Sequence, residues 1–228
     1  MTWNEDWGRI SAIARKDLIT ERRSKAGFNS VAALGVTMLV LFGFAFGPDA
    51  QALRDAAAGA LWLAILFAGV LAFNRSYQVE LESGALDELL QYPGARWTIY
   101  AGKLISNLIF VSLMLAIVVA AGIVLFQIHI PSAWPMLLVT LLLGIVGLVT
   151  LGTFYAAMAS RTRAREVLLP LLLFPMLVPV LLAAMSASKA LLGGDLMHEA
   201  SAWIRLLLGY DVIFLVAALF AFEHVIEV

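Results

Sequence analysis

The chain has 228 residues, of which 62% are apolar and 14% charged, and its formal net charge is -1. Soluble domains are about 45–50% apolar and about 25% charged, so this composition excludes an ordinary soluble protein and predicts a membrane protein. The absence of cysteine excludes disulfides, thiolate metal sites and cysteine nucleophiles. No polar stretch is long enough for a separate soluble domain, so we expect a single all-α domain over residues 1–228.

Residues 1–25 precede the first long apolar run and carry six Lys or Arg without an early apolar core, so a cleaved signal peptide is not expected. Five apolar residues recur here at helical spacing among the basic ones: Trp3, Trp7, Ile10, Ala14 and Leu18. This pattern is typical of a helix that lies in the lipid headgroup region with its tryptophans at the interface. A basic tail that only sets the topology is the alternative.

Six apolar runs are each long enough to cross a hydrocarbon core of about 30 Å. The six predicted spans cover roughly residues 28–47, 57–77, 100–127, 134–159, 167–188 and 203–223. With six spans, 12 of the 15 Lys and Arg fall on the side of the two termini and three on the other side. The positive-inside rule therefore places both termini in the cytoplasm.

Residues 80–93, ELESGALDELLQYP, lie between the second and third spans and predict a short amphipathic helix. Leu86, Leu89 and Leu90 follow i, i+3, i+4 spacing and form an apolar face, while most carboxylates lie elsewhere on the helix. Pro93 and the following glycine end the helix. Such a helix on the cytoplasmic side either lays its leucines in the groove of a partner protein or packs against its own bundle.

Glycine and proline mark two further features of the spans. Gly43 and Gly47 form a GxxxG pair in the first span, and three glycines dot the fourth, at positions 144, 147 and 152. Small residues let membrane helices approach closely, so these are predicted packing surfaces, one of which could serve a dimer. The fifth span contains Pro170, Pro175 and Pro179, which indicates either a bent or moving helix or the ordinary proline content of membrane helices.

Catalytic chemistry finds little support in this sequence. There is no GxxxxGK[ST] phosphate loop and no HExxH zinc motif. His129, His198 and His224 are scattered without metal-ligand spacing. Isolated loop histidines are usually solvated, and the alternative is that His129 and His198 meet outside the membrane and hold a metal or haem. We therefore expect no catalytic residue and no metal site.

Asp211 is the one carboxylate clearly inside a predicted span. Ionisable residues within the membrane are functional candidates by default. Arg205 lies almost two turns away and Tyr210 is adjacent, so a local structural network is the other interpretation. A proton-coupled carrier would need more such groups.

The complete pattern resembles the permease subunits of ABC-2-type transporters. It comprises a basic surface helix, six spans, cytoplasmic termini and E-x₃-G-x-L-[DE]-x-L-L-x₂-P followed by Lys103. It resembles most closely the CcmB family, haem exporter protein B of cytochrome c maturation, whose segment F-x-x-D-x-x-D-G-S-L-E-Q-L corresponds here to Y-Q-V-E-L-E-S-G-A-L-D-E-L from Tyr77 to Leu89. Gly84, Leu86 and Leu89 match, whereas Ser83 and Ala85 differ from that pattern.

The resemblance implies a type V exporter-like permease whose 80–93 segment is a coupling helix on a separate ATPase subunit. The residues implied in docking are Glu80, Glu82, Gly84, Leu86, Asp87, Leu89, Leu90 and Pro93. The implied location is the bacterial inner membrane. The implied partners are a CcmA-like ATPase, a second copy of the chain, CcmC-like and CcmD-like membrane subunits and a CcmE-like haem chaperone, with no nucleic acid.

In this family ATP binds the partner subunit, the complex handles haem, and no cofactor is expected on the chain itself. The work done is haem delivery or release of the haem-loaded chaperone. Two alternatives remain from the sequence: an ABC-2 permease that exports a lipid, polysaccharide or drug, and an ATP-independent scaffold or secondary carrier.

Overall fold

The computed structural model describes residues 3–47, 49–83, 95–129, 132–160, 165–195 and 197–225. Within these ranges the structured elements are seven α-helices without strands, which confirms the predicted all-α fold. The helices are α1 Trp3–Arg23, α2 Lys25–Phe46, α3 Ala50–Ser83, α5 Trp97–Leu125, α6 Trp134–Ser160, α7 Arg165–Leu192 and α8 Ala200–Val225.

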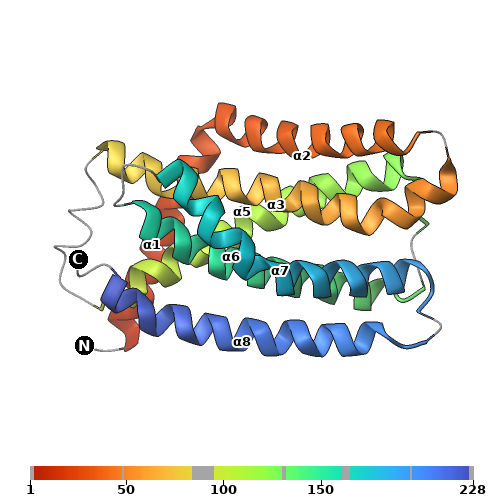
Figure 1. Ribbon diagram of the computed structural model, residues 1–228. Helices are drawn as coiled ribbons and strands as arrows, with labels where there is room; N and C mark the ends of the chain where they lie inside the picture. Colours follow the sequence, from red (N-terminus) through yellow and green to blue (C-terminus); the bar gives the residue numbers. More distant parts are fainter. Residues whose placement is uncertain are drawn as a thin grey trace.

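Six of these helices are long and apolar enough to span a membrane, and they run alongside one another in a bundle (Figure 1). Their membrane-compatible parts are Lys25–Phe46, Ala50–Gln78, Trp97–Leu125, Trp134–Ser160, Pro170–Leu192 and Ala200–Glu223. The six predicted spans are confirmed to within a few residues, except that α3 begins seven residues earlier than predicted. Both termini lie at the same end of the bundle, here called the terminal end (Figure 1).

Helices α3 and α6 form the centre of the bundle. Of the apolar window in each span, 72% is buried for α3 and 61% for α6, against 17% for both α2 and α8. The outer helices direct large apolar side chains outward, for example Phe44 of α2 and Phe220 of α8, which are 80% and 74% exposed. Such faces suit lipid chains or further membrane subunits.

Glycines of α6 make room for the largest side chains of α3. A Cβ at Gly144 would lie 2.2 Å from the Trp62 ring, and one at Gly152 would lie 2.1 Å from the Phe73 ring. Both rings are fully buried. The predicted packing role of these α6 glycines is therefore confirmed. Gly43 has open space around it, so the predicted GxxxG packing of α2 does not occur within the described part of this chain.

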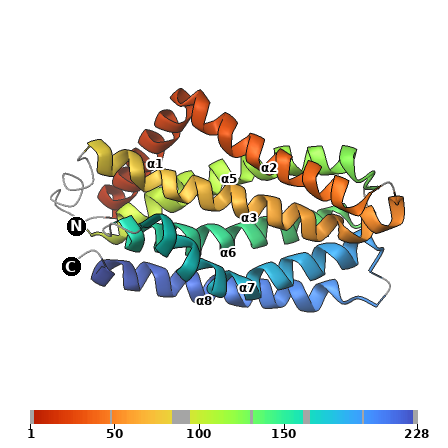
Figure 2. The same cartoon turned by 45° about the horizontal axis from the view of Figure 1, so that its top comes forward.

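Polar side chains connect the spans at several levels. Trp62 donates a hydrogen bond to Ser188 of α7, at 3.1 Å between Nε1 and Oγ. Tyr100 of α5 donates to the carbonyl of Thr150, at 2.9 Å. Helix α7 contains its three prolines and bends along its length (Figure 2), as expected where proline removes backbone hydrogen bonds.

Helix α1 confirms the helix predicted for residues 1–25. It turns back from α2 at Ser24 and crosses the terminal end of the bundle, where it meets α5 (Figure 2). Its buried apolar residues are Ile10, Ile13 and Ala14, whereas Trp7 is 55% exposed. One face of α1 is therefore packed on its own bundle, and Trp7 lies largely outside that face.

Candidate functional site

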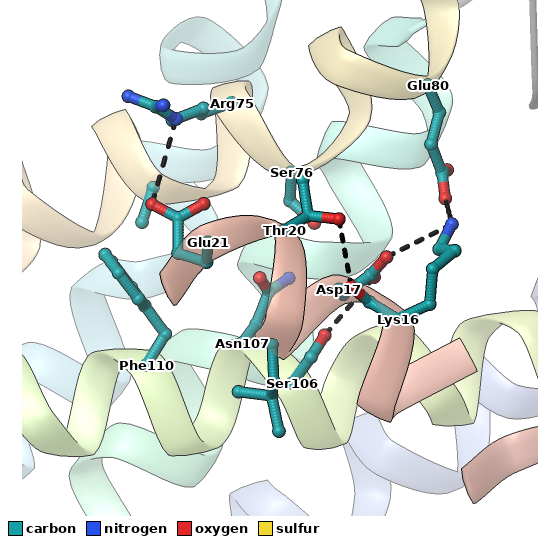
Figure 3. Close-up of a pocket in the computed structure, with 12 residues that line it drawn as sticks. Lys16, Asp17, Thr20, Glu21, Arg75, Ser76, Glu80, Ser106, Asn107 and Phe110 are labelled. Atoms are coloured by element: carbon teal, nitrogen blue, oxygen red, sulfur yellow. Dashed lines mark hydrogen bonds and ion pairs between the residues drawn. The ribbon is translucent and has the colours of Figure 1, made fainter. Parts of the chain in front are cut away.

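The candidate site lies where α1 crosses α3 and α5 (Figure 3). In the sequence, the α3 part of the site comes just before residues 84–94. Gly102 of α5 brings the two helices together, because a Cβ there would lie 2.8 Å from Cβ of Ile13 and 3.1 Å from the carbonyl oxygen of Ile10. A side chain at position 102 would push α1 off the bundle. The close backbone approach places the polar face of α1 against the ends of α3 and α5.

Lys103 is the centre of a buried ion-pair cluster. Its side chain is 0% exposed, and Nζ lies 2.8 Å from Oε2 of Glu80 and 3.3 Å from Oδ2 of Asp17. It also donates to the carbonyl of Ser76 at 3.1 Å and lies 4.5 Å from the centre of the Tyr77 ring. A buried ammonium needs such partners, because burying a charge without them is prohibitively costly.

Lys16 of α1 is the solvent-exposed member of the cluster. Its ammonium pairs with Glu80 and lies 3.2 Å from Oδ1 of Asp17. Burial alone would lower the pKa of Lys16, but the hydrogen bond to Glu80 and the charges of Asp17 and Glu80 outweigh burial and raise it. With Lys103 included, two cations face two carboxylates, so the four side chains carry no net charge.

A second ionic contact fixes the bend between α1 and α2. Arg75 of α3 reaches across to this bend, where Nε lies 3.7 Å from Oε1 of Glu21 and the guanidinium donates to Oγ of Ser24. The guanidinium occupies the space that a side chain at position 27 would take: a Cβ on Gly27 would lie 1.6 Å from Nη1. Burial raises the pKa of the Glu21 carboxyl, and the charge of Arg75 opposes that rise.

A cavity of about 170 Å³ lies between the cluster and the Arg75 contact (Figure 3). Its walls carry both signs of charge, together with Ser106 and Asn107 of α5. Asn107 is held by a hydrogen bond to Thr153 of α6, at 3.0 Å. The arrangement therefore ties three helices of the terminal end to the central helix α6.

The predicted docking residues divide into two groups. Residues 80–83 continue α3 as its last turn, so the helix predicted for 80–93 has no separate beginning at position 80. Glu80 is 4% exposed and faces inward into the cluster. Glu82 lies in the same last turn. Outside the described residues lie Gly84, Leu86, Asp87, Leu89, Leu90 and Pro93.

Sequence reasoning missed the pairing of Glu80 with Lys16 and Lys103. The partners are 64 and 23 positions away, so no local spacing connects them. The available signal was Lys103 itself, since a lysine within an apolar run needs a buried counter-charge. Glu80 is one of four acidic residues between the second and third predicted spans, with Glu82, Asp87 and Glu88, so the sequence narrows the choice of counter-charge without singling it out.

Asp211 of α8 is 4% exposed and faces α6, where its Oδ1 lies 2.6 Å from the position of a Cβ on Gly147. Both of its carboxyl oxygens are buried without a hydrogen-bond partner among the described residues. Arg205 donates instead to the carbonyl of Ser201, and Tyr210 to that of Met176. The local network considered for Asp211 from the sequence is therefore not found among the described residues.

The fold and the site define a multi-pass helical membrane protein whose N-terminal helix folds back onto the ends of its second and third spans. The family model described as CcmB protein matches residues 9–228, so the chain belongs to the CcmB family. This confirms the family resemblance noted in the sequence.

Individual relatives agree with this assignment. The chain is 34% identical to heme exporter protein B of Rhodobacter capsulatus over 174 residues, which are 76% of this chain and 79% of that protein. It is 31% identical to heme exporter protein B of Paracoccus denitrificans over 181 residues, covering 79% and 82% of the two chains. The corresponding protein of Pseudomonas aeruginosa is 28% identical over 183 residues, covering 80% and 81%.

Proposed function

We propose that the chain is the permease subunit of an ABC transporter complex that acts in cytochrome c maturation in the bacterial inner membrane. A separate CcmA-like ATPase supplies the energy, and the chain transmits it toward haem delivery or release of a haem-loaded chaperone. Membership of the CcmB family and the printed name of the relatives, heme exporter protein B, support this function. The excess of Lys and Arg on the side of the termini supports a cytoplasmic terminal end.

The observation that carries the proposal is the place of the Glu80 cluster. Residues 84–94 follow directly on the last turn of α3, and Glu80 in that turn is paired with Lys16 of α1 and Lys103 of α5. A force on residues 84–94 would therefore reach two further helices through ionic contacts. Such a force does work only if contacts differ between the resting and the pushed state. The ion pairs of Glu80 with Lys16 and Lys103 are contacts that could be made in one state and broken in the other.

Within this proposal the docking residues have separate roles. The leucine face of Leu86, Leu89 and Leu90 enters the ATPase groove, and Glu82 and Asp87 set its orientation by charge. Gly84 and Pro93 bound the segment. Because its carboxylate is buried in the cluster, Glu80 acts as the attachment of the segment to the bundle rather than as a surface contact.

The test is purification of the chain from native membranes in mild detergent, with measurement of the bound ATPase. We expect Leu89→Asp and Leu90→Asp to lose the ATPase while inserting normally, because a buried carboxylate is not tolerated in an apolar groove. Glu80→Gln should keep the ATPase but lower the yield of c-type cytochromes. Normal ATPase binding by both aspartate variants would overturn the docking role of this segment.

A second readout distinguishes the cargo. Loss of c-type cytochromes in a deletion strain, restored by the wild-type chain and not by Leu89→Asp, is the result we expect. Intact c-type cytochromes together with a missing envelope lipid, polysaccharide or drug-resistance phenotype would instead identify an ABC-2 exporter of another substrate. A chain that purifies with no ATPase under these conditions would overturn the proposal altogether.

A further inference from the structure

The cavity beside the Glu80 cluster has an apolar part and a charged part (Figure 3). On α3, Ala72 lies about one turn farther from the terminal end than Arg75. On α5, Phe110 lies about one turn farther from that end than Asn107. The apolar walls are therefore the deeper ones. The charged walls come from α1 and from the end of α3: Lys16, Asp17, Glu21, Arg75 and Glu80.

The cavity lies where the second span ends. Ala72 and Arg75 are within the last two turns of the apolar window of α3, which ends at Gln78. Helix α1, whose amphipathic pattern suits the membrane interface, forms the outer wall. Thr20 of α1 lines the cavity and is exposed, so the cavity opens beside this helix. This is the level of lipid headgroups and of the first carbons of their chains, and a phospholipid of the surrounding membrane can reach it.

The charges on the walls favour a ligand that carries both signs. The Glu80 cluster is neutral overall, and Arg75 and Glu21 balance each other beside it. A ligand with negative charge alone would meet the carboxylates of Asp17 and Glu21. A ligand with positive charge alone would meet the cations of Lys16 and Arg75. A zwitterion finds a partner for each of its charges.

Arg75 and Glu21 are the pair with capacity for such a ligand. Nε and Oε1 are 3.7 Å apart, which is too long for a hydrogen bond, and neither atom has a hydrogen-bond partner among the described residues. Burial raises the pKa of the Glu21 carboxyl more than the charge of Arg75 lowers it. The carboxylate is therefore incompletely compensated by Arg75, and a further cation beside it would be favourable.

The walls also distinguish between the two common types of zwitterionic headgroup. A primary ammonium donates three hydrogen bonds, which carboxylates accept, whereas a trimethylammonium donates none. A trimethylammonium is recognised instead by a cage of aromatic rings. Phe110 supplies the one aromatic ring among the described residues that line this cavity. The phosphate of either headgroup suits arginine, whose guanidinium binds it through charge-assisted hydrogen bonds.

We propose that this cavity binds the headgroup of a phospholipid with a primary ammonium, a phosphatidylethanolamine. The phosphate lies at Arg75 and the ammonium at Glu21, one turn from Asp17 on the same face of α1. The first carbons of the acyl chains lie against Ala72 and Phe110. Because the lipid contacts α1, α3 and α5 together, it strengthens the attachment of α1 to the bundle. The proposal involves neither an ATPase nor a cargo, so it is independent of the proposed function.

The experiment is native mass spectrometry of the full-length chain in mild detergent, titrated separately with dioleoyl phosphatidylethanolamine, phosphatidylcholine and phosphatidylglycerol. We expect phosphatidylethanolamine to bind about tenfold more tightly than the other two, since a charge-assisted hydrogen bond is worth at least that factor. Soluble glycerophosphoethanolamine, which carries the same charges without acyl chains, is added as a competitor. It should displace the lipid only in large excess, because it gains nothing from the apolar walls.

Two variants locate the lipid in this cavity. Thr20→Phe places a ring at its opening and should weaken phosphatidylethanolamine about tenfold. Ser11→Phe is the matched control, because both hydroxyls are exposed on α1 and donate to a backbone carbonyl one turn earlier, but Ser11 does not line the cavity. Glu21→Gln should remove the preference for phosphatidylethanolamine over phosphatidylcholine, whereas Glu5→Gln, an exposed carboxylate of α1 outside the cavity, should keep it.

Equal affinity of Thr20→Phe and Ser11→Phe for phosphatidylethanolamine would overturn the site. Thr20→Phe leaves every ion pair in place, so this comparison decides even if Glu21→Gln loosens α1. Phosphatidylglycerol that binds as tightly as phosphatidylethanolamine would identify an anionic-lipid site and overturn the assignment. Displacement of the lipid by glycerophosphoethanolamine at equal concentration would identify a site for a soluble zwitterion and overturn it as well.

Discussion

Replacing Lys103 by methionine tests the buried ion-pair cluster directly. Lys103 is 0% exposed and Glu80 is 5% exposed at the side chain, so solvent screens their 2.8 Å contact only weakly. Without the lysine, Glu80 and Asp17 face Lys16 alone, and the cluster gains a net negative charge. Removing one partner of a buried pair costs about 3–5 kcal/mol, and we expect Lys103→Met to lower the free energy of unfolding by this amount.

The double variant shows whether the cost arises from the unpaired charge. Glu80→Gln in the Lys103→Met background leaves Lys16 and Asp17, 3.2 Å apart, as a neutral pair. The double variant should therefore be about 2–3 kcal/mol more stable than the sum of the two single effects predicts, within the usual range for contacting residues. Each single variant leaves an unbalanced charge in a largely buried site, and the second change removes it.

Unfolding by SDS titration in mixed micelles, followed by circular dichroism, measures these free energies. Lys25→Met is the control, since it removes the same charge from an exposed position at the start of α2, and we expect a change within about 0.5 kcal/mol. Strict additivity of Lys103→Met and Glu80→Gln would show that the two side chains do not share a buried contact. The attachment proposed for the segment after α3 would then lose its physical basis.

Two other substitutions test single contacts. Gly27→Ala must displace the Arg75 guanidinium and should destabilise the protein by about 1–3 kcal/mol, as overpacking does. Gly43→Ala is the control, because a Cβ on Gly43 meets open space, and it should stabilise α2 by up to about 1 kcal/mol in the same SDS titration. If Gly27→Ala and Gly43→Ala changed the free energy of unfolding equally, the placement of Arg75 against Gly27 would be refuted. Asp211→Asn should keep or raise the stability, because neither carboxyl oxygen has a hydrogen-bond partner among the described residues and burying a carboxylate costs more than burying an amide. A loss beyond about 1 kcal/mol would mean that Asp211 has a stabilising charged partner.

The spans were predictable because length and hydrophobicity decide them locally. An apolar run of about 20 residues has no stable place except a helix across the membrane, whatever the rest of the chain does. The packing role of the α6 glycines was also predictable from local sequence, because small residues in a membrane helix mark the places where another helix can approach closely. Gly43 shows the limit of that rule. Its small size permits close contact but does not determine which helix makes it, and among the described residues no atom lies within 4 Å of a Cβ at this position.

The face of α1 was only partly predictable. Helical spacing joined Trp3, Trp7, Ile10, Ala14 and Leu18 into one stripe, yet the structure buries Ile13 with Ile10 and exposes Trp7. The reason is that Gly102 of α5 provides a local opening opposite Ile13. Periodicity reports which residues can share a face, whereas the buried part of that face depends on the surface it meets.

The charged residues at the terminal end serve topology and structure together. Lys16 and Lys103 count toward the positive charge that predicts a cytoplasmic terminal end, and the same two side chains hold Glu80. Arg75 likewise lies at the end of the second predicted span and fixes the bend between α1 and α2. Because Glu80 and Arg75 are both on α3, a displacement of the end of that helix would act on α1 at two points. Helix α1 therefore cannot move independently of α3 while both contacts hold. Under the proposed function, the end of α3 is the place where a push from an ATPase would reach the bundle.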